Sequence, residues 1–285
     1  GIDLNSALQR YTTRFNIDHT ANKLTVQLNT LIGFSKTNYA EGDWVGNSPR
    51  NPFQMTFRAK PYENPFRPDG SLNFGPNTTL RLTQVANLLE GIQNTSYQQN
   101  QIKLNGGLTL GYRVLPHVMI KNTLGVDMGS DMWQRYVNAN SFYGSLQQFQ
   151  SGENREAARV TTQLINTTSA MYSNKFNNVH EVEVGAFFEV VRAYQRGLGF
   201  TQFNLDPRLP GSGQGAGPLP TNNATTFPQN LSSARSGFGI RSYFATARYT
   251  FDDRYTLNAN IRRDGTSRIV NPENREILTW SAGLT

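Results

Sequence analysis

Three carboxylates lie close together in one segment of the chain, where two of them could act as a catalytic pair. Glu181, Glu183 and Glu189 lie in a stretch in which nearly every second residue is apolar. Residues two apart in an extended strand share a face and lie about 6.5–7 Å apart. That separation falls in the range of the two carboxylates of an inverting glycosidase. A hydrated acidic strip on the polar face of a strand has the same pattern, and we favour this second interpretation.

The other candidate chemistries are weaker. His19, His117 and His180 each fall beside a short turn on successive hairpins. Such positions lie roughly 10 Å apart, whereas zinc ligands lie about 2 Å from a shared ion. The chain has no cysteine, which excludes disulfides and thiolate sites. We therefore predict no metal site, no cofactor and no enzymatic activity.

A glycine-rich segment, 211–217, superficially resembles a phosphate-binding loop. Such a loop needs a strand before it and a helix after it. Here Pro210 precedes the segment and Pro218 follows it, so the sequence favours a flexible loop.

The composition is unlike that of an ordinary enzyme. Of the 285 residues, 37% are hydrophobic and only 16% are charged, while Asn, Thr, Gln, Ser and Gly abound. The net charge is +7, but the Lys and Arg residues are scattered, so nucleic acid is not the expected partner. No apolar run approaches the roughly 18 residues of a membrane-spanning helix.

The elements that must position these residues are strands, because apolar residues recur with a period of two. Tyr11, Phe15 and Ile17 share one face of the first strand, while Arg10 and Arg14 share the other. Hairpins with this alternation span roughly 10–35, 101–128, 162–190 and 243–263, and a ninth strand begins near 277. Strands of about 9–11 residues are long enough to cross a bilayer when tilted.

Short turns alternate along the chain with longer connections at 37–97, 129–160, 193–240 and 265–276. Short periplasmic turns and long extracellular loops are typical of outer-membrane barrels. We therefore predict an all-β fold, a partial antiparallel transmembrane β-barrel. A soluble carbohydrate-binding β-sandwich is the alternative, but structureless loops of this length are uncommon in compact domains.

Charged side chains cluster on one predicted face. A charge on the lipid face at mid-bilayer costs roughly 2–4 kcal/mol, so we predict that the following residues line the lumen: Arg10, Arg14, Lys103, Arg113, Lys121, Glu183, Arg248 and Arg262. Arg263 is the exception, and we place it at the outer interface, where this cost is small.

Several segments carry distinctive motifs. The clearest is 242–268, a strand, turn and strand that ends in RRDGTSR. The others are QRYTTRFNID at 9–18, NPFRPDG at 64–70, NLLEGIQN at 87–94 and LGVD at 124–127. Together they resemble segments of the SusC/RagA type of TonB-dependent transporters of Bacteroidota, in which a similar hairpin ends in an RRDGSSR-like motif. The last strand lacks the family's aromatic-Pro-Ser step, and the loop 197–240 is idiosyncratic.

The resemblance implies a plugged barrel of about 22 strands. It also implies a SusD-like surface lipoprotein at the mouth, a TonB complex that acts through a segment outside this chain, and a pairing of two SusC–SusD units. Nine strands cannot close such a barrel, because an open edge in lipid leaves backbone groups unpaired. We therefore expect residues 1–285 to be the middle portion of the barrel domain, embedded in outer-membrane lipid, with the plug and the carboxy-terminal strands outside it.

The expected function is TonB-dependent import of an oligomeric nutrient, a glycan or a peptide, across the outer membrane. The alternatives are a receptor for a metal chelate or vitamin and a barrel component of another envelope complex. Aromatic side chains in the long connections could stack on sugars, anchor a partner or pack the loops together. These candidate contacts are Trp44, Phe53, Phe57, Tyr62, Phe66, Trp133, Tyr136, Phe142, Tyr143 and Phe149.

Overall fold

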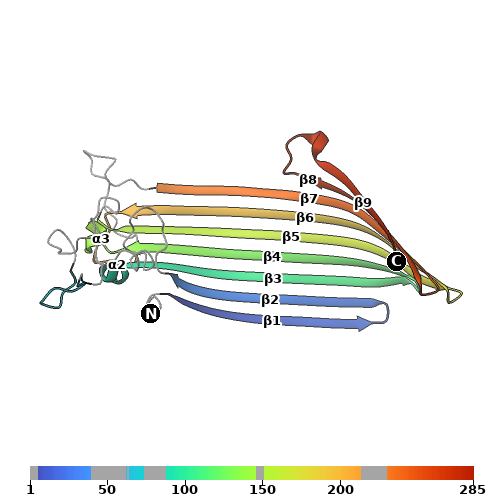
Figure 1. Ribbon diagram of the computed structural model, residues 1–285, viewed down its shortest axis with the longest axis horizontal. Coiled ribbons are helices and arrows are strands. Elements are labelled where there is room, and N and C mark those ends of the chain that lie inside the picture. The colour runs from blue at the N-terminus through green and yellow to red at the C-terminus, as the bar shows by residue number, and fades with distance from the viewer. Residues whose placement is uncertain (1–5, 40–61, 63, 74–87, 146–150, 213–229) are drawn as a thin grey trace.

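The protein is a single curved sheet whose strands follow one another in sequence order. The computed structural model describes residues 6–39, 62, 64–73, 88–145, 151–212 and 230–285. These residues form one antiparallel sheet of nine strands in the order β1 to β9, from blue to red in Figure 1. Such an up-and-down meander is the wall of a barrel. The structure confirms the predicted fold class, a partial antiparallel β-barrel.

The strands are β1 (Ala7–Ala21), β2 (Leu24–Tyr39), β3 (Thr95–Leu115), β4 (Val118–Val137), β5 (Glu153–Phe176), β6 (His180–Phe203), β7 (Asn230–Phe251), β8 (Tyr255–Thr266) and β9 (Glu276–Leu284). Short helices lie in the connections: α2 (Leu88–Asn94), α3 (Phe142–Ser145) and the 3-10 helix η1 (Pro272–Asn274). No helix in the described ranges is both long and apolar enough to cross a membrane.

Two of the hairpins turn on pairs of residues with positive φ. Asn177 and Asn178 have φ values of 50° and 59°, and Asp252 and Asp253 both have 52°. In each turn the backbone N–H after the pair donates back across the loop, at 3.1 Å to Phe176 and at 3.0 Å to Phe251. Asn and Asp tolerate the left-handed region better than other non-glycine residues. This chemistry explains why the chain turns at these two pairs.

The strands run further than the sequence indicated. β4 continues to Val137, and β5 begins already at Glu153. The connection predicted at 129–160 is therefore shorter and spans 138–152. The other three connections are also shorter than predicted: 204–229 in place of 193–240, 40–94 in place of 37–97, and 267–275 in place of 265–276. Above the bilayer both faces of a strand can be polar, so the alternation fades although the backbone pairing continues. The predicted loop bounds were wrong for this reason.

The two faces of the sheet differ in chemistry. One of them, here called the apolar face, carries large side chains that remain exposed, such as Phe188 (38%), Tyr243 (49%), Ile261 (49%) and Trp280 (77%). Buried apolar residues in the described ranges are confined to Tyr136, Val137 and Leu205. A soluble sandwich packs two sheets over a common core, whereas the described residues form one sheet. The sandwich alternative is therefore wrong.

A charge placed on the apolar face should destabilise the barrel. Val184 lies four residues after the start of β6 and is 44% exposed, about 13 Å along a strand and near the middle of the apolar band. We expect Val184→Arg to cost roughly 2–4 kcal/mol, measured as a lower midpoint of urea unfolding of the full transporter in lipid. Thr246→Arg, on the opposite face of the neighbouring strand, is the matched control. Equal midpoints for the two variants would contradict this assignment of the faces.

Candidate transport face of the barrel wall

The polar face, opposite the apolar face, carries all of the residues predicted to line the lumen. The strand register puts them on this one side of the sheet: Arg10, Arg14, Lys103, Arg113, Lys121, Glu183, Arg248 and Arg262. Glu183 and Arg248 are direct cross-strand partners, and Lys103 lies 3.7 Å from Asp127. In an outer-membrane barrel the polar face borders the interior.

The densest polar cluster on this face centres on Arg262 of β8, and we call it the Arg262 cluster. The guanidinium donates to both carboxylate oxygens of Asp264 at 2.8 and 2.9 Å. It also donates to Glu189 at 3.2 Å and to the hydroxyl of Ser242 at 3.0 Å. Thr167 donates to the other oxygen of Glu189 at 3.0 Å. One cation thus joins residues of four adjacent strands.

Stacked aromatic rings hold this guanidinium in place. Arg262 lies over the ring of Phe244 with its Cζ 4.6 Å from the centroid. Phe244 in turn stacks on Phe187 of β6 at 4.5 Å, with the ring planes only 6° apart. The cation–π contact and the bidentate carboxylate pair together fix the orientation of a long side chain. The cluster is therefore a preorganised polar site and not a set of free surface charges.

A second polar cluster lies nearer the extracellular end and centres on Asp131 of β4. Gln101 and Gln99 donate to one carboxylate oxygen at 2.7 and 3.3 Å. Arg159 approaches the other oxygen at 3.9 Å and lies 4.8 Å over the ring of Trp133. Asp131 is only 8% exposed. Its buried charge is balanced by amides and one guanidinium, as buried carboxylates require.

A network of buried polar groups ties together the connections above β3 and β4. Glu90 of α2, only 1% exposed, accepts from the backbone N–H of Phe142 at 2.9 Å and from the Asn94 amide at 3.1 Å. Asn138 donates to the Asn94 side chain at 3.0 Å. A Cβ at Gly144 would overlap the carbonyl oxygen of Asn138. These contacts form a tightly fitted rim at the mouth.

The aromatic residues predicted as loop contacts fall into four groups. Trp133 and Tyr136 belong to strand β4, so their placement in a loop was wrong, and Tyr136 is buried at 8% exposure. Phe142 and Tyr143 lie in α3. Tyr62 and Phe66 are exposed at 76% and 43%, and Phe66 bridges to Leu72. The remaining four lie outside the described residues: Trp44, Phe53, Phe57 and Phe149.

One charged pair in the described part of the mouth has a shifted ionisation. The Arg208 side chain and backbone N–H donate to the carboxylate of Asp206, which lowers the pKa of Asp206 to about 2. The Arg208 guanidinium is 87% exposed, so water screens the pair. The interaction shapes the local turn and adds little to stability.

The sequence did not reveal which side chains pair across strands. Period two assigns Arg262 and Glu189 to one face, but only the register brings them together, with Ser242 directly opposite both Glu189 and Asp264. Asp131 and Arg159, likewise cross-strand partners, were not singled out. The RRDG motif contains both Arg262 and Asp264 at a spacing of two, which is the one local signal for their contact.

Loss of the central guanidinium should weaken the wall. In Arg262→Met, Glu189 and Asp264 face each other without a cation. We expect the free energy of unfolding to fall by roughly 1–2 kcal/mol, measured as a lower midpoint when the full transporter is unfolded with guanidinium chloride. Adding Asp264→Asn should recover part of the loss, because it removes one of the two carboxylates. Arg248→Met, which removes a polar-face arginine with no ion pair in the described part of the chain, should change the midpoint little. A double variant as unstable as the single one would contradict this view.

The comparisons with known proteins support the fold. No protein-family model matches the sequence, and no curated protein does. Among solved structures, the chain is similar to the RagAB peptide transporter, with a TM-score of 0.75, 18% identity, and coverage of 98% of this chain and 30% of that chain. The RagAB peptide importer is similar in its closed-closed state (0.76, 18%) and its open-open state (0.75, 17%), with the same coverage.

At this level of identity the likeness concerns the fold. The chain spans 30% of the length of these transporter chains, and nearly all of it takes part in the match. The structure therefore has the fold of a wall segment from a SusC/RagA-type outer-membrane β-barrel, as the sequence motifs predicted.

Proposed function

We propose that the chain is part of the wall of a TonB-dependent importer that carries an oligomeric nutrient across the outer membrane. A SusD-like lipoprotein would cover the extracellular mouth, and a plug segment outside this chain would couple transport to the TonB complex. The observation that carries the proposal is the match of 98% of the chain to the RagAB peptide transporter with a TM-score of 0.75.

The chemistry of the polar face supports passage of a hydrogen-bonding solute. Carboxylates, guanidiniums and amides alternate along it, from the Asp131 side chain to the Arg262 cluster. A solute that sheds water inside a barrel needs replacement donors and acceptors. This wall offers both kinds within a few strands. Its function is to bind and pass the solute, and the proposal includes no catalytic step.

Within the two nutrient classes, we favour peptides. The similar solved structures are of a peptide transporter. Peptides carry backbone amides and charges of both signs, and the polar face presents paired charges of both signs, such as Arg159 with Asp131 and Arg262 with Glu189. Uncharged glycans can bind these side chains only through hydrogen bonds, whereas a peptide can also form ion pairs with them.

A gene deletion tests the proposal in the native organism. We expect loss of the full transporter to abolish growth on oligopeptides as sole nitrogen source and to leave growth on free amino acids intact. The purified transporter should also carry oligopeptides, detected by mass spectrometry after extraction. Loss of growth on a glycan alone would instead make the nutrient a glycan. Normal growth on both, with loss of metal-chelate or vitamin uptake, would overturn the proposal.

An aromatic residue on the polar face should take part in uptake. Trp133 lies on this face beside Arg159, where its ring can contact a passing solute. We expect Trp133→Ala to lower the uptake of labelled oligopeptide several-fold while binding of the SusD-like lipoprotein is unchanged. Trp280→Ala removes the same side chain from the apolar face, where Trp280 is 77% exposed, and should leave uptake near the wild-type rate. Equal uptake by the two variants would contradict a role for Trp133.

A further inference from the structure

The apolar face becomes basic towards the extracellular ends of β6, β7 and β8. The sequence singled out Arg263 alone, but the register puts five arginines on this face, which we call the basic belt: Arg192, Arg196, Arg235, Arg241 and Arg263. All five are exposed. Of the carboxylates that the structure describes, only Glu276 lies among them. The expectation that this face is almost free of charge did not cover Arg196 and Arg235, because both lay in the predicted connection 193–240.

The height of the basic belt follows from strand geometry. Phe251 lies at the periplasmic end of β7, and Arg241 lies ten residues from it. Ten residues correspond to about 33 Å along the strand. At a tilt of about 40° this corresponds to roughly 25 Å along the barrel axis, the height of the apolar band of an outer-membrane barrel. Arg192 by the same reckoning lies at roughly 30 Å, and Arg196 with Arg235 at roughly 40 Å. Arg263, eight residues after the start of β8, lies at roughly 20 Å. The belt thus begins in the upper part of the apolar band, crosses the layer of lipid headgroups and continues above it.

Most of this charge is uncompensated. Arg241 and Arg263 share Glu276, at 3.3 Å in the case of Arg241. Within the described ranges no carboxylate pairs with Arg192, Arg196 or Arg235. Arg196 and Arg235 are direct cross-strand partners, an arrangement in which like charges repel. A bound anion between them would relieve this repulsion.

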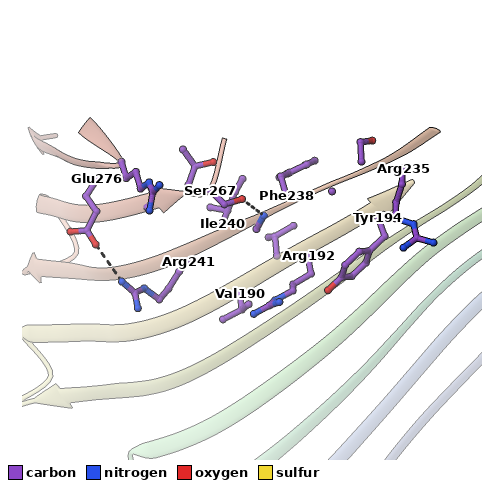
Figure 2. Close-up of a pocket in the computed structure, with 16 residues that line it drawn as sticks. Val190, Arg192, Tyr194, Arg235, Phe238, Ile240, Arg241, Ser267 and Glu276 are labelled. Carbon is purple, nitrogen blue, oxygen red and sulfur yellow. Dashed lines mark hydrogen bonds and ion pairs between the residues drawn. The ribbon is translucent and has the colours of Figure 1, made fainter. Parts of the chain in front are cut away.

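A groove lies directly beside the basic belt. β8 ends at Thr266 opposite Ile240, so no described strand pairs with β7 on that side above this point. A cavity of about 790 Å³ extends over the free edge of β7, lined by apolar groups such as Tyr194 and Ile240 and by Arg192, Arg235 and Arg241. Figure 2 shows these arginines along β6 and β7 around the groove. Its apolar walls and basic margin suit an amphiphilic molecule with an anionic head.

The occupant must therefore contact hydrocarbon and carry negative charge. The belt continues downward into exposed apolar side chains, among them Tyr243 and Phe188, whose rings pack 5.0 Å apart. Every cation of the belt is an arginine, whose planar fork binds phosphate oxygens in pairs. We propose that the basic belt is a binding site for the phosphate groups of phosphorylated glycolipids in the outer leaflet, with the groove beside β7 taking part of the same lipid.

The test uses the full transporter with its partners, placed in phosphatidylcholine nanodiscs with bisphosphorylated lipid A, with its dephosphorylated form, or without either. Bound lipid is counted by native mass spectrometry after release. We expect the wild type to retain the bisphosphorylated form and the variant R192Q/R196Q/R235Q to retain on the order of tenfold less. R248Q, which removes an arginine from the polar face of β7, is the matched control and should retain it fully. Inorganic phosphate should not displace the lipid.

The outcomes separate the lipid from other occupants. Equal retention by wild type and the triple variant, equal binding of dephosphorylated lipid, or displacement by inorganic phosphate would each overturn the proposal. Loss of the SusD-like lipoprotein or of self-association, with lipid retention intact, would show that the belt is a protein interface. If the triple variant does not assemble, R192Q alone should retain several-fold less lipid, because Arg192 has no ion pair in the described part of the chain to lose.

Discussion

The backbone hydrogen-bond ladder is the constraint on which the rest of this structure depends. In a bilayer no water is present to satisfy an unpaired N–H or C=O group, and each such group costs several kcal/mol. Every strand from β2 to β8 pairs on both sides with its neighbours in sequence. Because the strands are paired in this ladder, successive side chains point to opposite faces of the sheet. Alternate residues therefore face the lipid and the interior. Apolar and polar residues therefore alternate in the sequence because the backbone N–H and C=O groups must pair between strands.

The same ladder does not stop at the membrane surface. β5 and β6 have 24 residues each, more than twice the roughly 9–11 that a tilted strand needs to span the bilayer. The extracellular parts of β3 to β6 are joined by the buried Glu90 network and by the small core of Tyr136, Val137 and Leu205. The extracellular end of the wall is therefore built on paired strands, and side chains there, such as Trp133, are held by the sheet and not by a loop.

This extension explains what could be predicted from the sequence and what could not. The turns at Asn177–Asn178 and Asp252–Asp253 were predictable, because few other residues accept positive φ. The faces were predictable within the bilayer, where solvent differs on the two sides. The strand ends were not, because charged residues lie on both faces of the strands above the bilayer, such as Arg155 and Glu156 on β5, and leave no alternation to read. Nor were the partners of Arg262, since a residue's face is local information and its cross-strand neighbour depends on register.

Arginine is used in opposite ways on the two faces of the same strands. On the polar face Arg262 is surrounded by acceptors from its own chain, with Asp264 and Glu189 both within 3.2 Å. On the apolar face Arg196 and Arg235 stand opposite each other with no carboxylate nearby in the described ranges. A side chain paired within its own wall contributes to that wall, whatever surrounds the barrel. A side chain left unpaired at the height of the headgroups is stabilised only by what surrounds it, so the membrane itself completes this part of the structure.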